Sequence, residues 1–304
     1  MPNENHIPWT QNNGFPDWIT AFIWILFSFI LFQISGAVVT IIALWLDPGV
    51  TFSVDILLNL DQYLDHVFIA NSVSQILFMG IGTWVIARLS IHPEERPTFL
   101  RFTYRKDTID LILLAVLFVI AIQPLIMLMS WLNAQLPLPE TYLDLETGQM
   151  EMLENYLTND HIVLLTLFHV GLVPAICEEV LYRGYVLRML ERSWGIWAAI
   201  LVSGFIFGIY HMRITQLLPL AVLGIALAYI TWKSGSLYPA IAAHFVNNGG
   251  AVLMASYYPE YASETMGMPE LPSLALLLPS ILVTGVLLYI IHHRDKFQRK
   301  KSYV

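Results

Sequence analysis

The chain contains 304 residues, of which 57% are hydrophobic and 12% charged, and its net charge is −8. Soluble domains carry about 25% charged residues, so this composition predicts a multi-pass membrane protein. No polar stretch is long enough to form a soluble domain, and we therefore expect no nucleic-acid partner. The single cysteine, Cys177, excludes an intrachain disulfide and a cysteine zinc cluster.

Long apolar runs recur along the whole chain, and about 20 apolar residues suffice to cross the hydrocarbon core. They predict eight helices, at residues 18–46, 65–89, 109–134, 160–190, 195–213, 215–232, 237–256 and 272–292. The first run is too long for a signal peptide, so we expect it to be retained. The prediction is an all-α bundle forming a single integral-membrane domain over residues 1–304, with the motif-bearing helices at 160–256.

Basic residues gather on one side of this arrangement, and cytoplasmic loops carry an excess of Lys and Arg. They are Arg96, Arg101, Arg105, Lys106, Arg188, Arg192, Lys233 and the tail from Arg294 onward. Acidic residues such as Asp47, Glu146 and Glu260 fall in the opposite loops, where Arg213 is the exception. Both termini, 1–17 and 293–304, are therefore expected in the cytoplasm.

Three polar clusters interrupt the later apolar runs: Glu178 to Arg183, Phe207 to His211 and His244 to Asn248. Ionisable side chains inside a membrane are costly and by default indicate a functional interior. Carboxylates, imidazoles and amides are also the groups that activate water and stabilise an oxyanion. The clusters therefore predict a hydrolytic site.

The spacing of the charged residues on a helix predicts different roles for the carboxylates of Glu178 and Glu179. Glu179 and Arg183 are four residues apart, so they share a helix face and can pair. Glu178 points about 100° away and is free to address a water molecule. A structural ion pair is the alternative, and a lone membrane histidine often serves only as a partner between helices. Two histidines, His211 and His244, beside these carboxylates weaken that alternative.

The ordered motifs Glu-Glu-x-x-x-Arg, Phe-x-x-x-His and His-x-x-x-Asn resemble the CPBP family of intramembrane endopeptidases. That family includes the Rce1-type CAAX prenyl proteases and the bacterial Abi proteins. The match covers about Leu172 to Gly250, and Tyr182-Arg183-Gly184 looks like the family's aromatic-Arg-Gly ending.

The resemblance implies a role for each motif residue. Glu178 would be the general base, and Glu179 with Arg183 would support it. His211 would help to position the water or shuttle its proton. His244 and Asn248 would stabilise the oxyanion, while Phe207 would only pack. Counted along the predicted spans, His211 lies in the outer half of the membrane and Glu178 in the inner half, so these roles require an arrangement that brings the two together.

Two alternatives remain for the activation of water. Glu178, His211 and His244 would make a reasonable His₂Glu site for Zn²⁺. No His-Glu-x-x-His motif is present, and we favour a metal-free water activated by Glu178.

Neighbouring residues have plainer interpretations. Cys177 precedes Glu178 and points about 100° away from it, so we expect it to pack. His169 is out of phase with Glu178 and should face elsewhere. Gly204 and Gly208 form a small-residue face that lets another helix approach closely.

The resulting hypothesis is an endopeptidase that cleaves a membrane-associated protein or peptide in a prokaryotic plasma membrane. A prenylated CAAX-type tail is the substrate that one branch of the resembled family implies. One rival is a transporter, but the internal repeat that transporters carry in matching halves is not evident. The other is a non-catalytic scaffold or immunity protein of the same family. The sequence leaves the oligomeric state open.

Overall fold

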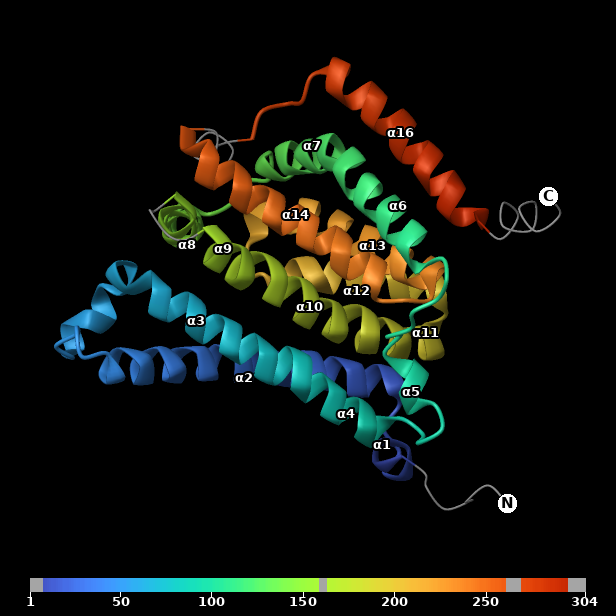
Figure 1. Cartoon of the computed structure of the whole chain (residues 1–304), viewed down its shortest axis with the longest axis horizontal. Coiled ribbons are helices and arrows are strands. Elements are labelled where there is room, and N and C mark those ends of the chain that lie inside the picture. The colour runs from blue at the N-terminus through green and yellow to red at the C-terminus, as the bar shows by residue number, and fades with distance from the viewer. Residues whose placement is uncertain (1–7, 159–162, 261–268, 295–304) are drawn as a thin grey trace.

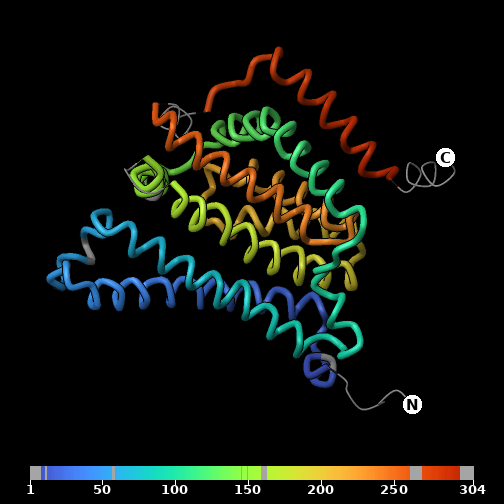
Figure 2. The backbone as a smooth tube through the Cα atoms, in the orientation of Figure 1, coloured from blue at the N-terminus to red at the C-terminus, as the bar shows by residue number. Residues whose placement is uncertain are grey.

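The computed structural model describes residues 8–158, 163–260 and 269–294, and every regular element within these ranges is a helix. Helices appear at all eight predicted positions, so the all-α prediction is confirmed. Figures 1 and 2 show three groups of helices that cross the molecule in roughly the same direction. The expected positive tail beyond Arg294 lies outside the described residues.

The first group is a helical hairpin at one edge of the molecule (Figure 1). A short helix, α1, precedes it, and two short 3₁₀ turns, η1 and η2, connect its two arms. One arm is α2 and the other consists of α3, the π-helical segment η3 and α4. The elements are α1 (Trp9–Asn12), α2 (Asp17–Leu46), η1 (Val54–Leu58), η2 (Leu60–Tyr63), α3 (Leu64–Ser74), η3 (Gln75–Gly82) and α4 (Thr83–Ser90). The indole N–H of Trp24 donates to Thr83 Oγ1 at 2.9 Å and joins the two arms.

The second group is the centre of the bundle and begins with one continuous helical run, Val163–Trp194. It consists of α9 (Val163–Thr166), η4 (Leu167–Leu172), α10 (Val173–Glu179), η5 (Val180–Val186) and α11 (Leu187–Trp194). The segments η4 and η5 are π-helical, a form often found at functional sites. In its most apolar stretch 56% of the residues are buried, against 22% in α2, so this run is the core helix.

Two helices that follow, α12 (Ile196–Tyr210) and α13 (Leu217–Ser234), cross in close contact. A Cβ atom placed on Gly204 would lie 2.6 Å from the backbone nitrogen of Ile225, and one on Gly208 would lie 2.9 Å from the Leu217 carbonyl oxygen. The small-residue face predicted for Gly204 and Gly208 is therefore confirmed, and its partner is α13. The 3₁₀ turn η6 (Ile214–Gln216) connects the two helices.

The third group lies on the other side of the core and contains α6, α7 and α16 (Figure 1). Its helices are α6 (Thr108–Ala121), α7 (Gln123–Ala134) and α16 (Leu274–His292). The remaining helices of the chain are α5 (Arg96–Phe99), α8 (Glu140–Thr158) and α14 (Tyr238–Tyr257). The axes of α6 and α7 differ by 42°, and Pro124, which has no backbone N–H to donate, lies in the first turn of α7. Helix α14 packs between this group and the core run.

Among the described residues, five helices are long and apolar enough to cross a membrane, and the bent pair α6–α7 makes a sixth candidate. The chain is thus an integral membrane protein. Two of the eight predicted helices fall short of that test: α12 has 15 residues, and the polar residues of α14 lower its hydropathy. The start of α2 and the end of α16 lie at the same end of the bundle (Figure 1), the arrangement that an even number of crossings predicts. Eight spans with cytoplasmic termini remain a prediction.

Candidate active site

Glu179 and Arg183 form a buried ion pair at the junction of α10 and η5. Arg183 Nη1 donates to Glu179 Oε1 at 2.8 Å, and the two side chains are 1% and 0% exposed. Arg183 Nη2 also donates to the Gly224 carbonyl at 3.1 Å, and its guanidinium lies 4.5 Å from the Phe207 ring centre. The arginine therefore ties the core run to both α12 and α13.

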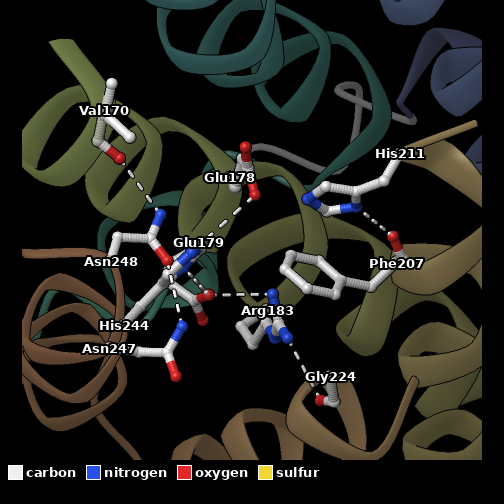
Figure 3. Close-up of polar contacts among 10 residues, drawn as sticks. All are labelled: Val170, Glu178, Glu179, Arg183, Phe207, His211, Gly224, His244, Asn247 and Asn248. Carbon is white, nitrogen blue, oxygen red and sulfur yellow. Dashed lines mark hydrogen bonds and ion pairs between the residues drawn. The ribbon is translucent and has the colours of Figure 1, made fainter. Parts of the chain in front are cut away.

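His244 joins this pair from α14. Its Nδ1 donates to Glu179 Oε1 at 2.9 Å, so one carboxylate oxygen accepts from both the arginine and the histidine. Because a carboxylate only accepts, the ring proton of neutral His244 lies on Nδ1. Its Nε2 then faces Glu178, with 4.0 Å between Nε2 and Glu178 Oε2 (Figure 3).

Glu178 differs from Glu179 in accepting no hydrogen bond from the described residues, whereas Glu179 accepts two through Oε1 and leaves only its Oε2 without a partner. The residue is only 8% exposed, and within the described part of the chain its buried Oε2 has no hydrogen-bond partner. The 4.0 Å separation from His244 Nε2 is too long for a hydrogen bond but short enough for one water molecule to bridge. The division predicted from spacing, one carboxylate held and one free, matches this geometry.

His211 follows the last residue of α12. Its Nδ1 donates to the Phe207 carbonyl at 2.7 Å, and the ring points toward Glu178 (Figure 3). This tautomer leaves Nε2 as an acceptor. The structure thus brings His211 toward Glu178, as the predicted roles require (Figure 3). With a rise of about 1.5 Å per residue, the 15 residues of α12 are also shorter than a full crossing.

Asn248 lies one turn after His244 at the end of a chain of amides. It donates through Nδ2 to the Val170 carbonyl at 3.1 Å and accepts from Asn247 Nδ2 at 3.1 Å. Gln123 Nε2 in turn donates to Asn247 Oδ1 at 3.0 Å. One N–H of Asn248 remains available. Sequence reasoning missed Gln123, whose only signal is a polar residue beside a proline in an apolar run.

The neighbours expected to lie outside the site do so. His169 Nδ1 shares a 2.7 Å hydrogen bond with Ser72 Oγ on α3. Cys177 lines an apolar groove between α10 and η3 that is lined by neither Glu178 nor His211.

The fit of a metal can be tested on the same atoms. Both histidines donate through Nδ1 and present Nε2, which is how metal-binding histidines are usually held. Yet no three His, Cys, Asp or Glu side chains in the described ranges are grouped closely enough to hold an ion. The Zn²⁺ site considered for Glu178, His211 and His244 therefore does not fit this geometry.

The site lies in a segment that is similar to a known family of membrane proteases. Residues 160–250 match the family model described as type II CAAX prenyl endopeptidase Rce1-like. This segment is Rce1-like. The match spans α9 to the middle of α14 and contains all three motifs, whereas α2 to α8 and α16 lie outside it. No curated protein and no solved structure matches the chain.

Proposed function

We propose that this protein is an intramembrane endopeptidase that hydrolyses a peptide bond in a membrane-associated protein or peptide. One observation carries the proposal: a buried carboxylate, Glu178, faces the Nε2 atom of His244 across 4.0 Å, within an Rce1-like segment. A carboxylate oxygen without a protein partner is the acceptor that a general base needs.

In this proposal Glu178 removes a proton from the attacking water as the water oxygen bonds to the scissile carbonyl carbon. The Nε2 atom of His211 accepts the water's second hydrogen bond and orients it. The proton held by Glu178 then passes to the leaving amine as the carbon–nitrogen bond breaks. Both side chains act from fixed positions, because His211 is held by Phe207 and Glu178 is part of the core run.

The oxyanion is stabilised from α14. Asn248 has one N–H left to donate, while His244 can donate from Nε2 only as an imidazolium. The positive charge of that imidazolium would face two carboxylates. Glu178 Oε2 lies 4.0 Å from Nε2 of His244, and Glu179 Oε1 lies 2.9 Å from its Nδ1. Glu179 and Arg183 are positioning residues, since they orient the imidazole ring.

A prenylated CAAX-type tail is the substrate class suggested by the matched family model. The test is cleavage of a farnesylated peptide and its unprenylated counterpart by the purified full-length protein. We expect cleavage by the wild type and by Glu191→Gln, a matched control whose carboxylate pairs with Arg101 away from the site. Glu178→Gln should be inactive.

Loss of activity in Glu178→Gln and retention in Glu191→Gln would support the peptidase. A folded wild-type protein that cleaves neither these peptides nor a panel of membrane-protein substrates would instead favour a non-catalytic scaffold. The host membrane, which we expect to be a prokaryotic plasma membrane, is established separately by localising the native protein.

A further inference from the structure

A lateral apolar groove runs along the core helix on the side away from Glu178. It has a volume of about 520 Å³ and lies between η3–α4 and the η4–α10–η5 run. Gly80 and Trp84 line one wall, and Ile176, Cys177 and Val180 line the other. Its lining is almost wholly apolar, so the groove suits a hydrocarbon chain.

One end of the groove continues into a pocket of different character. This second cavity, about 410 Å³, shares Trp84, Leu100 and Phe102 with the groove. It adds two arginines, Arg88 and Arg96. We call the two cavities together the Arg88 groove: an apolar channel with a cationic end. Its parts fall within the size range of about 300–1,000 Å³ typical of ligand sites.

The two arginines differ from their neighbours in lacking an acidic partner. Arg101 pairs with Glu191 at 2.9 Å, and Arg192 pairs with Glu95. Within the described ranges, by contrast, Arg88 lies 3.9 Å over the Trp84 ring and Arg96 donates to the Ile91 carbonyl at 3.0 Å, with no carboxylate at ion-pair distance from either. Both side chains are exposed. Their charges are therefore available to an anion.

We propose that the Arg88 groove binds one anionic glycerophospholipid, with its phosphate on Arg88 and Arg96 and an acyl chain along the apolar channel. Guanidinium groups match phosphate oxygens in geometry and charge. Trp84 adds the amphipathic ring found at the level of lipid headgroups. Anionic lipids concentrate in the cytoplasmic leaflet, the side on which the sequence predicts Arg96.

The bound lipid would pack against the helix that carries the proposed base. Ile176, Cys177 and Val180 form the groove wall within two residues of Glu178. Lipid binding itself does not depend on the peptidase proposal, because none of the groove residues is assigned a part in the chemistry.

The test is native mass spectrometry of the full-length protein with phosphatidylglycerol and phosphatidylcholine of identical acyl chains. We expect the wild type to retain phosphatidylglycerol severalfold more than phosphatidylcholine, and Arg88→Gln with Arg96→Gln to lose that preference. Lys233→Gln is the matched control, since Lys233 also lies over a tryptophan, Trp232 at 4.6 Å, but lines neither cavity. Equal retention of both lipids by the wild type would overturn the proposal.

A second variant tests the apolar channel. A Cβ atom on Gly80 would point at Cys177, 3.5 Å from its Sγ, so Gly80→Leu fills the groove without adding charge. We expect it to weaken retention of both lipids. The measurement is repeated in Glu178→Gln, where binding should persist whether or not the protein is a peptidase. Displacement of the lipid by a farnesylated peptide in that variant would assign the groove to substrate and contradict the proposal.

Discussion

At the scale of single residues, the site depends on the different hydrogen-bond partners of two adjacent glutamates, Glu178 and Glu179. Glu179 is 0% exposed and accepts from Arg183 and His244 through Oε1, whereas Glu178 accepts no hydrogen bond from the described residues. Adjacent residues on a helix point about 100° apart. That angle places the two carboxylates in different surroundings, and the proposed function gives a supporting role to Glu179 and the role of base to Glu178.

Replacing Glu178 by Gln removes the base while keeping the shape of the side chain. We predict a fall in kcat/KM of about 10²–10⁴-fold, the usual contribution of a general base. The measurement is peptide cleavage, with the melting temperature recorded to show that the fold survives. An active, folded Glu178→Gln variant would remove Glu178 from the mechanism.

Arg183→Met should act on stability as well as on activity. The change leaves the Glu179 carboxylate buried without its cation, which costs about 3–5 kcal/mol. Thermal unfolding in detergent should show a clear fall in melting temperature, partly recovered when Glu179→Gln is added. If the single and double variants were equally stable, Arg183 and Glu179 would not be coupled.

Chelation separates the two ways of activating water. Since no suitable cluster of metal-binding side chains is formed in the described ranges, we predict that prolonged treatment with a strong chelator leaves cleavage unchanged. Activity that disappears with chelator and returns with Zn²⁺ would contradict both the geometry and the proposed base.

At the scale of helices, the crossing of α12 and α13 sets the position of His211. A Cβ atom on Gly224 would lie 2.6 Å from the Gly204 carbonyl oxygen, and the atoms it would meet are backbone. A methyl group can therefore be accommodated only if the two helices separate. Separation would move the end of α12, and with it the imidazole of His211.

Gly224→Ala is accordingly predicted to destabilise the protein by about 1–3 kcal/mol, the range for overpacking, and to reduce cleavage. Gly285→Ala on α16 is the matched control, because its Cβ meets nothing within 4 Å. Melting temperature and activity are measured for both. Equal behaviour of the two variants would show that the close crossing does not govern the site.

At the scale of the whole molecule, charge and helix count predict both termini on one side of the membrane. Cys177 is the only cysteine and is buried, so Cys177→Ala provides a background for labelling single introduced cysteines. We predict that Lys106→Cys reacts with an impermeant thiol reagent only from the cytoplasmic side, and Glu260→Cys only from the outside. Labelling of both from the same side would exclude the eight-span arrangement.

The local features of this protein were predictable because they depend on short stretches of chain. Apolar runs of sufficient length specify the helices, and four-residue spacing specifies the Glu179–Arg183 pair. Cys177 was expected to point away from the site because it directly precedes Glu178, and adjacent residues on a helix point about 100° apart. The order of the three motifs also sufficed to predict the Rce1-like resemblance of residues 160–250.

Only the tertiary structure decided which groups meet. No spacing relates His244 to Glu179, 65 residues apart, or Gln123 to Asn247, 124 residues apart. Counting along the spans could not show that His211, which directly follows α12, lies beside Glu178 (Figure 3). Contacts between distant helices depend on how their surfaces pack, and that packing, at glycines 204 and 224 above all, arises only when the whole bundle forms.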